Sequence, residues 1–234
     1  MATALLLLWS ARLTHSYLRR EKWRLGARED WRYEEMRAAW GGHWWWWSLV
    51  PVYAVQHALL AGLALPAYVG KCGAELPWAQ TPQARAGLLA RFFAPAPPCT
   101  LAPWTPLDSA SVAISLAGLA LAAAADTQLH AHLAAAKARG VRAPLLRSGV
   151  WRVSRHPNYV GETLFWAGTA LSAAAAGGKW AAAGWGLNTA CLAAVTLMTE
   201  RRTAASRPAA GWAAHCAQTP CWAPLGPLSL RRVL

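Results

Sequence analysis

Long uncharged stretches constrain this chain more than any other feature of its sequence. Residues 44–69, 109–125 and 180–199 contain no Asp, Glu, Lys or Arg, and residues 163–178 add a fourth such stretch. A helix needs about 20 apolar residues to cross a bilayer core, so residues 44–69 and 180–199 are long enough. Hydrophobic residues make up 56% of the 234 residues and charged residues only 14%. The sequence therefore predicts a membrane protein.

Extending these stretches through nearby polar positions predicts an all-α, polytopic bundle of about five transmembrane helices. The second stretch continues past Asp126 to about residue 136, and the fourth reaches back to Tyr159 if Glu162 faces protein or water. Residues 1–18 form the fifth helix. They lack the basic start and the cleavage site of a signal peptide, so we expect a membrane helix whose beginning has been cut away.

The distribution of basic residues sets the expected orientation. The net charge is +13, and 18 of the 23 Lys and Arg residues lie in residues 19–37, 137–155 and 201–234. Five helices place these three regions on one side, which is then cytoplasmic by the positive-inside rule. The N-terminus is expected outside. Because the charge follows the membrane and no basic-aromatic motif is present, we expect no nucleic-acid partner. Only four basic residues fall in the opposite loops: Lys71, Arg85, Arg91 and Lys179.

Two further segments are expected at the membrane surface. Residues 19–37 are charged throughout and predict a short surface helix. Trp40 and the run from Trp44 to Trp47 are typical of an interfacial aromatic belt at the entry of the next helix. Gly140 is a plausible stop for the helix over residues 107–136. A single domain over residues 1–225, followed by a tail over 226–234, is expected.

The motif SRHPNYVGE, residues 154–162, is the most informative local pattern. Pro157 suits the first position of a helix, because its fixed φ is helical and its missing N–H would be unpaired there. A helix N-terminus next to Arg155 and His156 favours a phosphate or carboxylate. Asn158 and Glu162 are four residues apart and share a face. The alternative is a basic membrane anchor with a satisfied polar cap.

Three acids lie at the expected cytoplasmic helix ends: Asp126, Glu162 and Glu200. Ionisable groups at such positions are costly and usually functional, although structural salt bridges would also explain them. The cysteines give weaker signals. Cys72 and Cys99 share an outer loop and could pair if that side is oxidising. A zinc site is not expected, because the paired ligand spacing is missing from His215, Cys216 and Cys221.

Four blocks in order resemble one family over roughly residues 10–225. SRHPNYVGE is similar to the signature of the DUF1295 group, which is related to the C-terminal domain of steroid 5α-reductases. The segment from Glu29 to Arg37 is similar to that family's EDxRYxxMR. The other two blocks are Asp126-x-Gln128 before Gly149-x-Trp151-Arg152, and Glu200-Arg201 followed by Arg207-Pro208, Trp212, Thr219 and Pro224.

The resemblance implies a membrane reductase that takes hydride from NADPH and delivers it to a C=C bond of a steroid- or lipid-like enone. Asn158, Tyr159 and Glu162 would line the nicotinamide end of the cofactor site. Guanidinium groups suit the phosphates. The full set implied for the cofactor is Asp126, Gln128, Arg152, Arg155, His156, Asn158, Tyr159, Glu162, Glu200 and Arg207. The residues implied in catalysis are Tyr159, Glu162 and Tyr17, with His15 as a second donor near the N-terminus.

The chain departs from the family pattern in two places. The family carries further helices before the position of Met1, and in steroid reductases those helices contact the substrate carbonyl. In the tail, Trp212 and His215 replace tyrosines that are usual in the family. Basic residues common in the family are replaced by Ala217, Gln218 and Cys221.

Two other functions stay open. The isoprenylcysteine and phospholipid methyltransferases resemble this fold and carry a related RHPxYxG signature with S-adenosylmethionine. Asn158 and Glu162 favour the reductase. A non-catalytic or degenerate membrane protein is the second alternative. The expected location is the endoplasmic reticulum or another endomembrane in a eukaryote, and the inner membrane in a bacterium.

Overall fold

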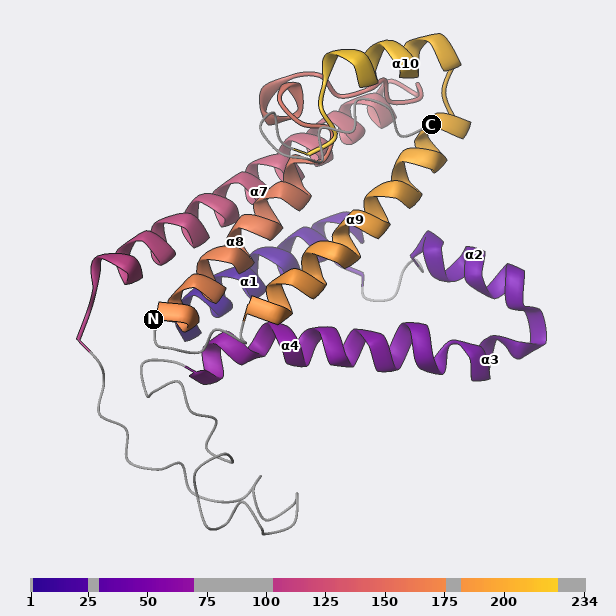
Figure 1. Ribbon diagram of the computed structural model, residues 1–234. Helices are drawn as coiled ribbons and strands as arrows, with labels where there is room; N and C mark the ends of the chain where they lie inside the picture. Colours follow the sequence, from indigo (N-terminus) through magenta and orange to yellow (C-terminus); the bar gives the residue numbers. More distant parts are fainter. Residues whose placement is uncertain (1, 25–29, 70–102, 176–181, 223–234) are drawn as a thin grey trace.

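The computed structural model describes residues 2–24, 30–69, 103–175 and 182–222 (Figure 1). Every regular element in these residues is a helix, which confirms the predicted all-α class. The longer helices are α1 (Ala2–Arg20), α4 (Val55–Val69), α7 (Pro106–Ala138), α8 (Pro157–Ala175) and α9 (Ala182–Ala205). The shorter ones are α2 (Trp31–Trp40), α3 (Trp44–Trp47) and α10 (Ala209–Gln218). Cys72 and Cys99, whose pairing the sequence leaves open, and the expected domain boundary at residue 225 lie outside the described residues.

Among the described residues, two helices, α7 and α9, are long and apolar enough to cross a membrane. The segments Trp31–Trp47 and Val52–Ala64 meet at a bend of 73°. If they form one broken span, they add a third crossing. The helices α1 and α8 lie where membrane helices were predicted. They carry Arg12 and Glu162, however, and neither is among the helices that qualify by length and composition. The predicted total of five spans therefore stays a prediction.

Local signals explain both ends of α7. Thr105 and Asp108 form a capping box, in which the Thr105 N–H donates to the Asp108 carboxylate at 2.8 Å and the Asp108 N–H donates to the Thr105 hydroxyl at 3.3 Å. Pro106 takes the first helical position. Gly140 has a φ of +65° just after the helix, and the Val141 N–H donates to the Ala136 carbonyl at 3.1 Å. The predicted stop at Gly140 is confirmed.

The segment between α1 and α4 differs from the prediction. A continuous helix was expected from residue 44 to 69, but a π-helical turn over Leu49–Ala54 interrupts it. Such turns bend helices, and this one contains Pro51. The expected surface helix over residues 19–37 is also divided, because α1 runs to Arg20 and α2 begins at Trp31. Trp45 and Trp46 in α3 are 77% and 78% exposed, as an interfacial belt requires.

Small residues bring the main helices together. α7 and α8 lie side by side (Figure 1) and make the most extensive helix–helix contact of the described chain. Gly118 and Ala122 of α7 face Gly161 of α8 at this contact. A Cβ added at Gly161 would lie 2.6 Å from both the Gly118 carbonyl oxygen and the Ala122 nitrogen, so the two backbones could not approach as closely. Close contact of this kind is how helices associate without a hydrophobic driving force between them. The same argument applies to α4 and α9, which touch at Gly62 and Gly184.

The functional end of the bundle is where the basic regions meet. The C-terminal ends of α7 and α9 and the N-terminal end of α8 lie together, with α10 across them (Figure 1). α2 joins this end through an ion pair of 2.8 Å between Glu35 and Arg202 at the end of α9. The described parts of residues 137–155 and 201–222 therefore lie together at one end of the fold, and the predicted sidedness stays a prediction.

Candidate functional site

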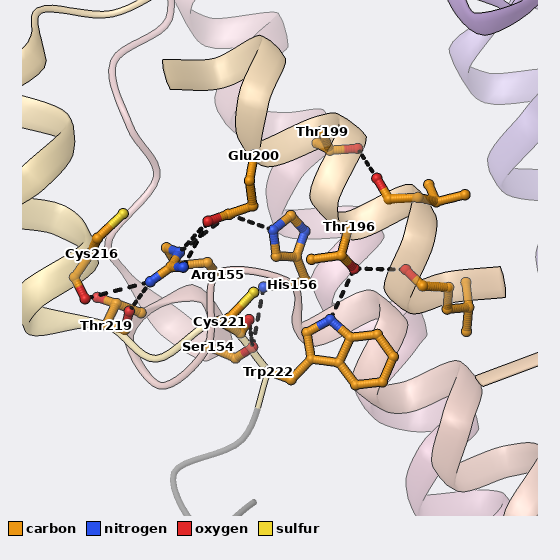
Figure 2. A network of polar contacts seen from close by, with 12 residues as sticks. Ser154, Arg155, His156, Thr196, Thr199, Glu200, Cys216, Thr219, Cys221 and Trp222 are labelled. Carbon is orange, nitrogen blue, oxygen red and sulfur yellow. Dashed lines mark hydrogen bonds and ion pairs between the residues drawn. The ribbon is translucent and has the colours of Figure 1, made fainter. Parts of the chain in front are cut away.

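A buried ion network lies at the start of α8 (Figure 2). The Arg155 guanidinium donates to both oxygens of Glu200, from Nη2 at 2.6 Å and from Nε at 3.1 and 3.2 Å. His156 Nε2 lies 2.7 Å from Oε1 of the same Glu200 carboxylate. The three residues are only 3–7% exposed. Burial acts to lower the pKa of Arg155, but the hydrogen bonds and charge of Glu200 raise it overall, so the pair stays ionised.

The segment after α10 runs beside the 154–156 loop and completes this network (Figure 2). The Arg155 and His156 N–H groups donate to the carbonyls of Pro220 and Cys221 at 3.0 and 3.2 Å. The Arg155 side chain donates to the Thr219 carbonyl at 2.6 Å. The Trp222 indole donates to the hydroxyl of Thr196 in α9 at 2.9 Å. The end of the described chain is therefore part of the site.

One potential metal ligand atom from each of His156, Glu200 and Cys221 lies within 4.8 Å of the other two. Burial raises the pKa of the Cys221 thiol to about 11, so the thiol is protonated at neutral pH. Arg155 already compensates the Glu200 carboxylate. A divalent cation would have to displace the proton between His156 and Glu200 and ionise the thiol beside a guanidinium. We assign no metal to this cluster, and the expectation of a metal-free site stays a prediction.

A cavity of about 260 Å³ opens beside the network, between the ends of α7, α8, α9 and α10. Leu129, Leu133 and Trp151 provide part of its apolar wall. The Tyr159 ring stacks on the His156 imidazole, with centroids 5.3 Å apart and planes 8° from parallel. Apolar walls with a few converging polar groups are typical of small-molecule sites.

Four polar side chains of this cavity are uncommitted within the described part of the chain. Asn158 and Tyr159, in the first turn of α8, have no described hydrogen-bond partner for their side chains. The buried atoms Arg207 Nε and His215 Nδ1 also lack a partner among the described residues. Arg207 lies in the connection between α9 and α10, and His215 lies in α10. The cavity can therefore bind a ligand that offers both hydrogen-bond acceptors and negative charge.

Within the third sequence block, only Trp151 lines the cavity, and the others, Asp126, Gln128, Gly149 and Arg152, lie outside its lining. The Gln128 amide oxygen accepts a hydrogen bond of 3.0 Å from the Val150 N–H, and its side chain packs against Gly149, whose φ is +59°. The Trp151 indole donates to the Ala125 carbonyl at 3.1 Å. Arg152 is exposed. Gln128 and Trp151 thus fix the 149–152 turn that leads into the motif.

A second polar cluster lies deeper in the bundle, around Arg12 of α1. Its guanidinium forms ion pairs with Asp126 of α7, at 2.8 Å, and with Glu162 of α8. Trp9 donates to Glu162 at 2.8 Å, and Ser16 donates to Asp126 at 3.2 Å. Two of the predicted cofactor residues are therefore held by α1. Sequence reasoning missed Arg12, although a lone cation in an apolar helix signals a need for acidic partners.

The two donors proposed near the N-terminus lie away from both clusters. Tyr17 is half-buried, with the Arg20 guanidinium carbon 5.7 Å from its ring centroid. His15 is exposed and makes an edge contact with Trp23 at 6.2 Å. In the described chain, α1 binds Asp126 and Glu162 through Trp9, Arg12 and Ser16 instead.

The family-like block at the start of α2 approaches the cavity from another side. Asp30 caps α2 and also binds the Arg32 guanidinium, at 2.8 and 2.7 Å. The charge of Arg32 interacts with Tyr159 as well. Arg202 lies 4.2 Å from the Trp31 ring centroid, which fixes the helix at the end of α9.

His215 should give the protein a marked acid sensitivity. Burial, with Arg147 and Arg155 nearby, lowers the pKa of His215 from 6.5 to about 4. Between these values the unfolded chain binds a proton that the folded chain does not, so stability is full above the unfolded pKa and falls as pH decreases toward 4. We expect the thermal midpoint of His215→Gln to fall less than that of the wild type from about pH 7 to about pH 5.

The exposed His43 gives the matched control. His43→Gln, a change at an exposed side chain outside the site, should keep the pH dependence of the wild type. Equal curves for wild type and His215→Gln would show that His215 does not cause the acid sensitivity.

The fold and the site together define a class: an all-helical protein with two or three helices able to cross a membrane, and a polar cavity at one end of the bundle. The chain belongs to the family described as "Protein of unknown function (DUF1295)", which matches residues 1–219. The predicted family is therefore confirmed. No curated protein and no solved structure matches the chain.

Proposed function

We propose that this protein is a membrane-embedded reductase that binds NADPH at the cavity and reduces a C=C bond of a lipid enone. The observation that carries the proposal is the convergence of four uncommitted polar side chains, from α8, the α9–α10 connection and α10, on one cavity next to Arg155. Phosphate and carboxamide groups need such donors and acceptors. The motif resemblance supplies the choice of NADPH.

The residues at the cavity fit one end of a dinucleotide. The volume of about 260 Å³ lies just below the usual range for small-molecule sites, roughly 300–1,000 Å³, so the whole cofactor would extend beyond it. Arg207, with its free Nε, suits a phosphate, and Asn158 suits an amide group. Arg155, His156 and Glu200 bind one another and keep the wall in place.

NADPH, when bound, supplies the hydride, and the protein supplies orientation and a dry environment. Tyr159 carries the hydroxyl best placed to donate to a substrate oxygen, because no described residue accepts from it and its ring is held against His156. Glu162 lies one helical turn beyond Asn158 and binds Arg12, so it acts through the position of α1. We propose a multi-pass protein of an endomembrane or a bacterial inner membrane, with the cavity on the cytoplasmic side.

The size of the cavity favours a methyltransferase as the alternative function. S-adenosylmethionine is smaller than NADPH and would leave less of itself outside 260 Å³. A methyltransferase is therefore the second candidate, and a non-catalytic protein the third.

Binding to the purified protein separates these functions. NADPH should raise the melting temperature of the wild type, and the shift should shrink at high salt because phosphate–arginine contacts are screened. Asn158→Ala should weaken the binding of NADPH, by about tenfold for each 1.4 kcal/mol of binding free energy lost. The melting temperature of this variant without ligand should equal that of the wild type. Gln218→Ala, an exposed change in α10, is the matched control. Stabilisation by S-adenosylmethionine alone would establish the rival, and stabilisation by neither would indicate a non-catalytic protein.

A further inference from the structure

His215 of α10 is a buried histidine in the wall of the cavity, and one of its ring nitrogens is unsatisfied. The residue is 4% exposed, and its Nδ1 has no hydrogen-bond partner among the described residues. Arg207 lines the same cavity, and its buried Nε also lacks a partner in this part of the chain. Buried polar groups without a partner are uncommon in native proteins, so two of them at one cavity point to a ligand.

Positive charge dominates this end of the cavity. Glu200 is the sole acid among the described lining residues, and both of its oxygens are already bound within the buried ion network. No ion pair joins Arg147 or Arg207 to a carboxylate in the described chain, and Arg147 donates to the Gly211 carbonyl of α10 at 3.3 Å. The uncompensated charge of these two guanidinium groups favours an anionic ligand.

The same surroundings keep the His215 imidazole neutral when no anion is bound. Burial is the largest cause that lowers the pKa of His215 to about 4, and the positive charges of Arg147 and Arg155 add to it. A negative charge beside the imidazole favours its protonated form instead. Proton binding and anion binding must then strengthen each other equally, because the coupling between two ligands is reciprocal.

The other titratable and charged groups around this end of the cavity do not supply that negative charge. Glu200 favours the imidazolium form, but its effect on the pKa of His215 is smaller than that of Arg147 or of Arg155. Burial raises the pKa of the Cys216 thiol, which stays protonated at neutral pH. A proton on His215 therefore needs an anionic partner from outside the described chain. The full set of these groups is His132, Arg147, Arg155, His156, Tyr159, Glu200, Arg207 and Cys216.

We propose that Arg207 and His215 hold a phosphate group at this end of the cavity, and that His215 takes up a proton as the phosphate binds. The guanidinium and the imidazolium then match the two negative charges of a phosphate monoester or of a diphosphate. Ligand affinity therefore increases as the pH falls. The use of this coupling to regulate NADPH binding rests on the proposed function, whereas the coupling of an anion to a proton does not.

The test uses inorganic sulfate, which has the shape of phosphate and keeps its two charges throughout the pH range of the experiment. Sulfate is titrated into the full chain with nitrogen-15-labelled histidines, in nanodiscs of zwitterionic lipid, with chloride holding the ionic strength constant. At about pH 6 the nuclear magnetic resonance signals of His215, assigned with His215→Gln, should move from the neutral to the imidazolium form as sulfate binds. Between about pH 7 and pH 5 the sulfate affinity should rise by up to about tenfold per pH unit, because one proton is taken up with each anion.

Three variants separate the two residues. His215→Gln should bind sulfate with an affinity that no longer depends on pH, whereas Arg207→Gln should bind it more weakly at every pH and keep the dependence. His43→Gln, at an exposed histidine, is the matched control and should behave as the wild type does. If His215→Gln fails to fold, the wild-type titration and Arg207→Gln carry the test. A wild-type affinity that is independent of pH, or an affinity that Arg207→Gln leaves unchanged, would overturn the proposal.

Competition identifies the phosphate, and NADPH separates this inference from the proposed function. 2′-AMP carries a phosphate monoester and ADP-ribose a diphosphate, so the compound that displaces sulfate at the lower concentration shows which of them the site prefers. Displacement by neither compound would contradict the assignment to phosphate. Stabilisation by NADPH without pH-dependent sulfate binding would reject the inference and leave the reductase proposal in place. The opposite result would reject NADPH as the cofactor and keep the anion site.

Discussion

Glu200→Gln should lower the free energy of unfolding by about 3–5 kcal/mol, because it removes the carboxylate that compensates a buried guanidinium. The Arg155 and Glu200 side chains are 2% and 3% exposed, and the change would leave the cation with carbonyl partners only. The thermal midpoint should fall by on the order of 10 °C. Thermal unfolding of the purified protein, followed by circular dichroism, measures the effect.

A second glutamate–arginine pair provides the control. Glu35 and Arg202 are 2.8 Å apart, but their side chains are 61% and 50% exposed. Surface ion pairs contribute about 0–1 kcal/mol, so Glu35→Gln should barely change the midpoint. Replacing both Arg155 and Glu200 by apolar residues of similar size should restore much of the loss, since no charge is left unpaired. Similar losses for Glu200→Gln and Glu35→Gln would contradict this account.

Arg12→Met should be almost as damaging, since it leaves the carboxylates of Asp126 and Glu162 without their shared cation. The side chains of these three residues are 12–20% exposed, and methionine keeps most of the arginine volume. We expect a loss of about 3–5 kcal/mol, measured by the same thermal unfolding.

Rescue distinguishes lost charge from lost packing. Adding Asp126→Asn and Glu162→Gln to Arg12→Met removes both unpaired carboxylates and should recover most of the midpoint. Arg139→Met, at the exposed end of α7, should have little effect, because its guanidinium bonds only the Ala135 carbonyl among the described residues. If the triple variant is no more stable than Arg12→Met alone, the cluster is not held by charge.

The sequence predicted the helices well because their signals are local. Uncharged stretches located α7, α8 and α9, and Gly140 located the end of α7. The π-helical turn over Leu49–Ala54 could not be predicted, since an uncharged run has the same composition in a straight helix and in a bent one. The chain bends there by 73°. Pro51 lies in the turn, but a proline in an uncharged run does not by itself specify a π-helical turn.

The partners of the charged residues were the least predictable part of the site. Asn158, Tyr159, Glu200 and Arg207 do line one cavity, and whether they bind a cofactor stays a prediction. Asp126 and Glu162 were expected there too, but both bind Arg12, more than 110 residues earlier in the chain. Which cation pairs with which acid depends on how α1 packs against α7 and α8, and a motif within one helix carries no information about that packing.

The two backbone hydrogen bonds from Arg155 and His156 to Pro220 and Cys221 have a consequence for biosynthesis. The carbonyls that receive the Arg155 and His156 N–H groups are made more than 60 residues after those groups. A ribosome must therefore synthesise the chain at least as far as Cys221 before the entrance of α8 can acquire its final hydrogen bonds. The site therefore matures after the described helices around it, and premature termination after Gln218 would yield a chain that has these helices but lacks the carbonyls that complete the site.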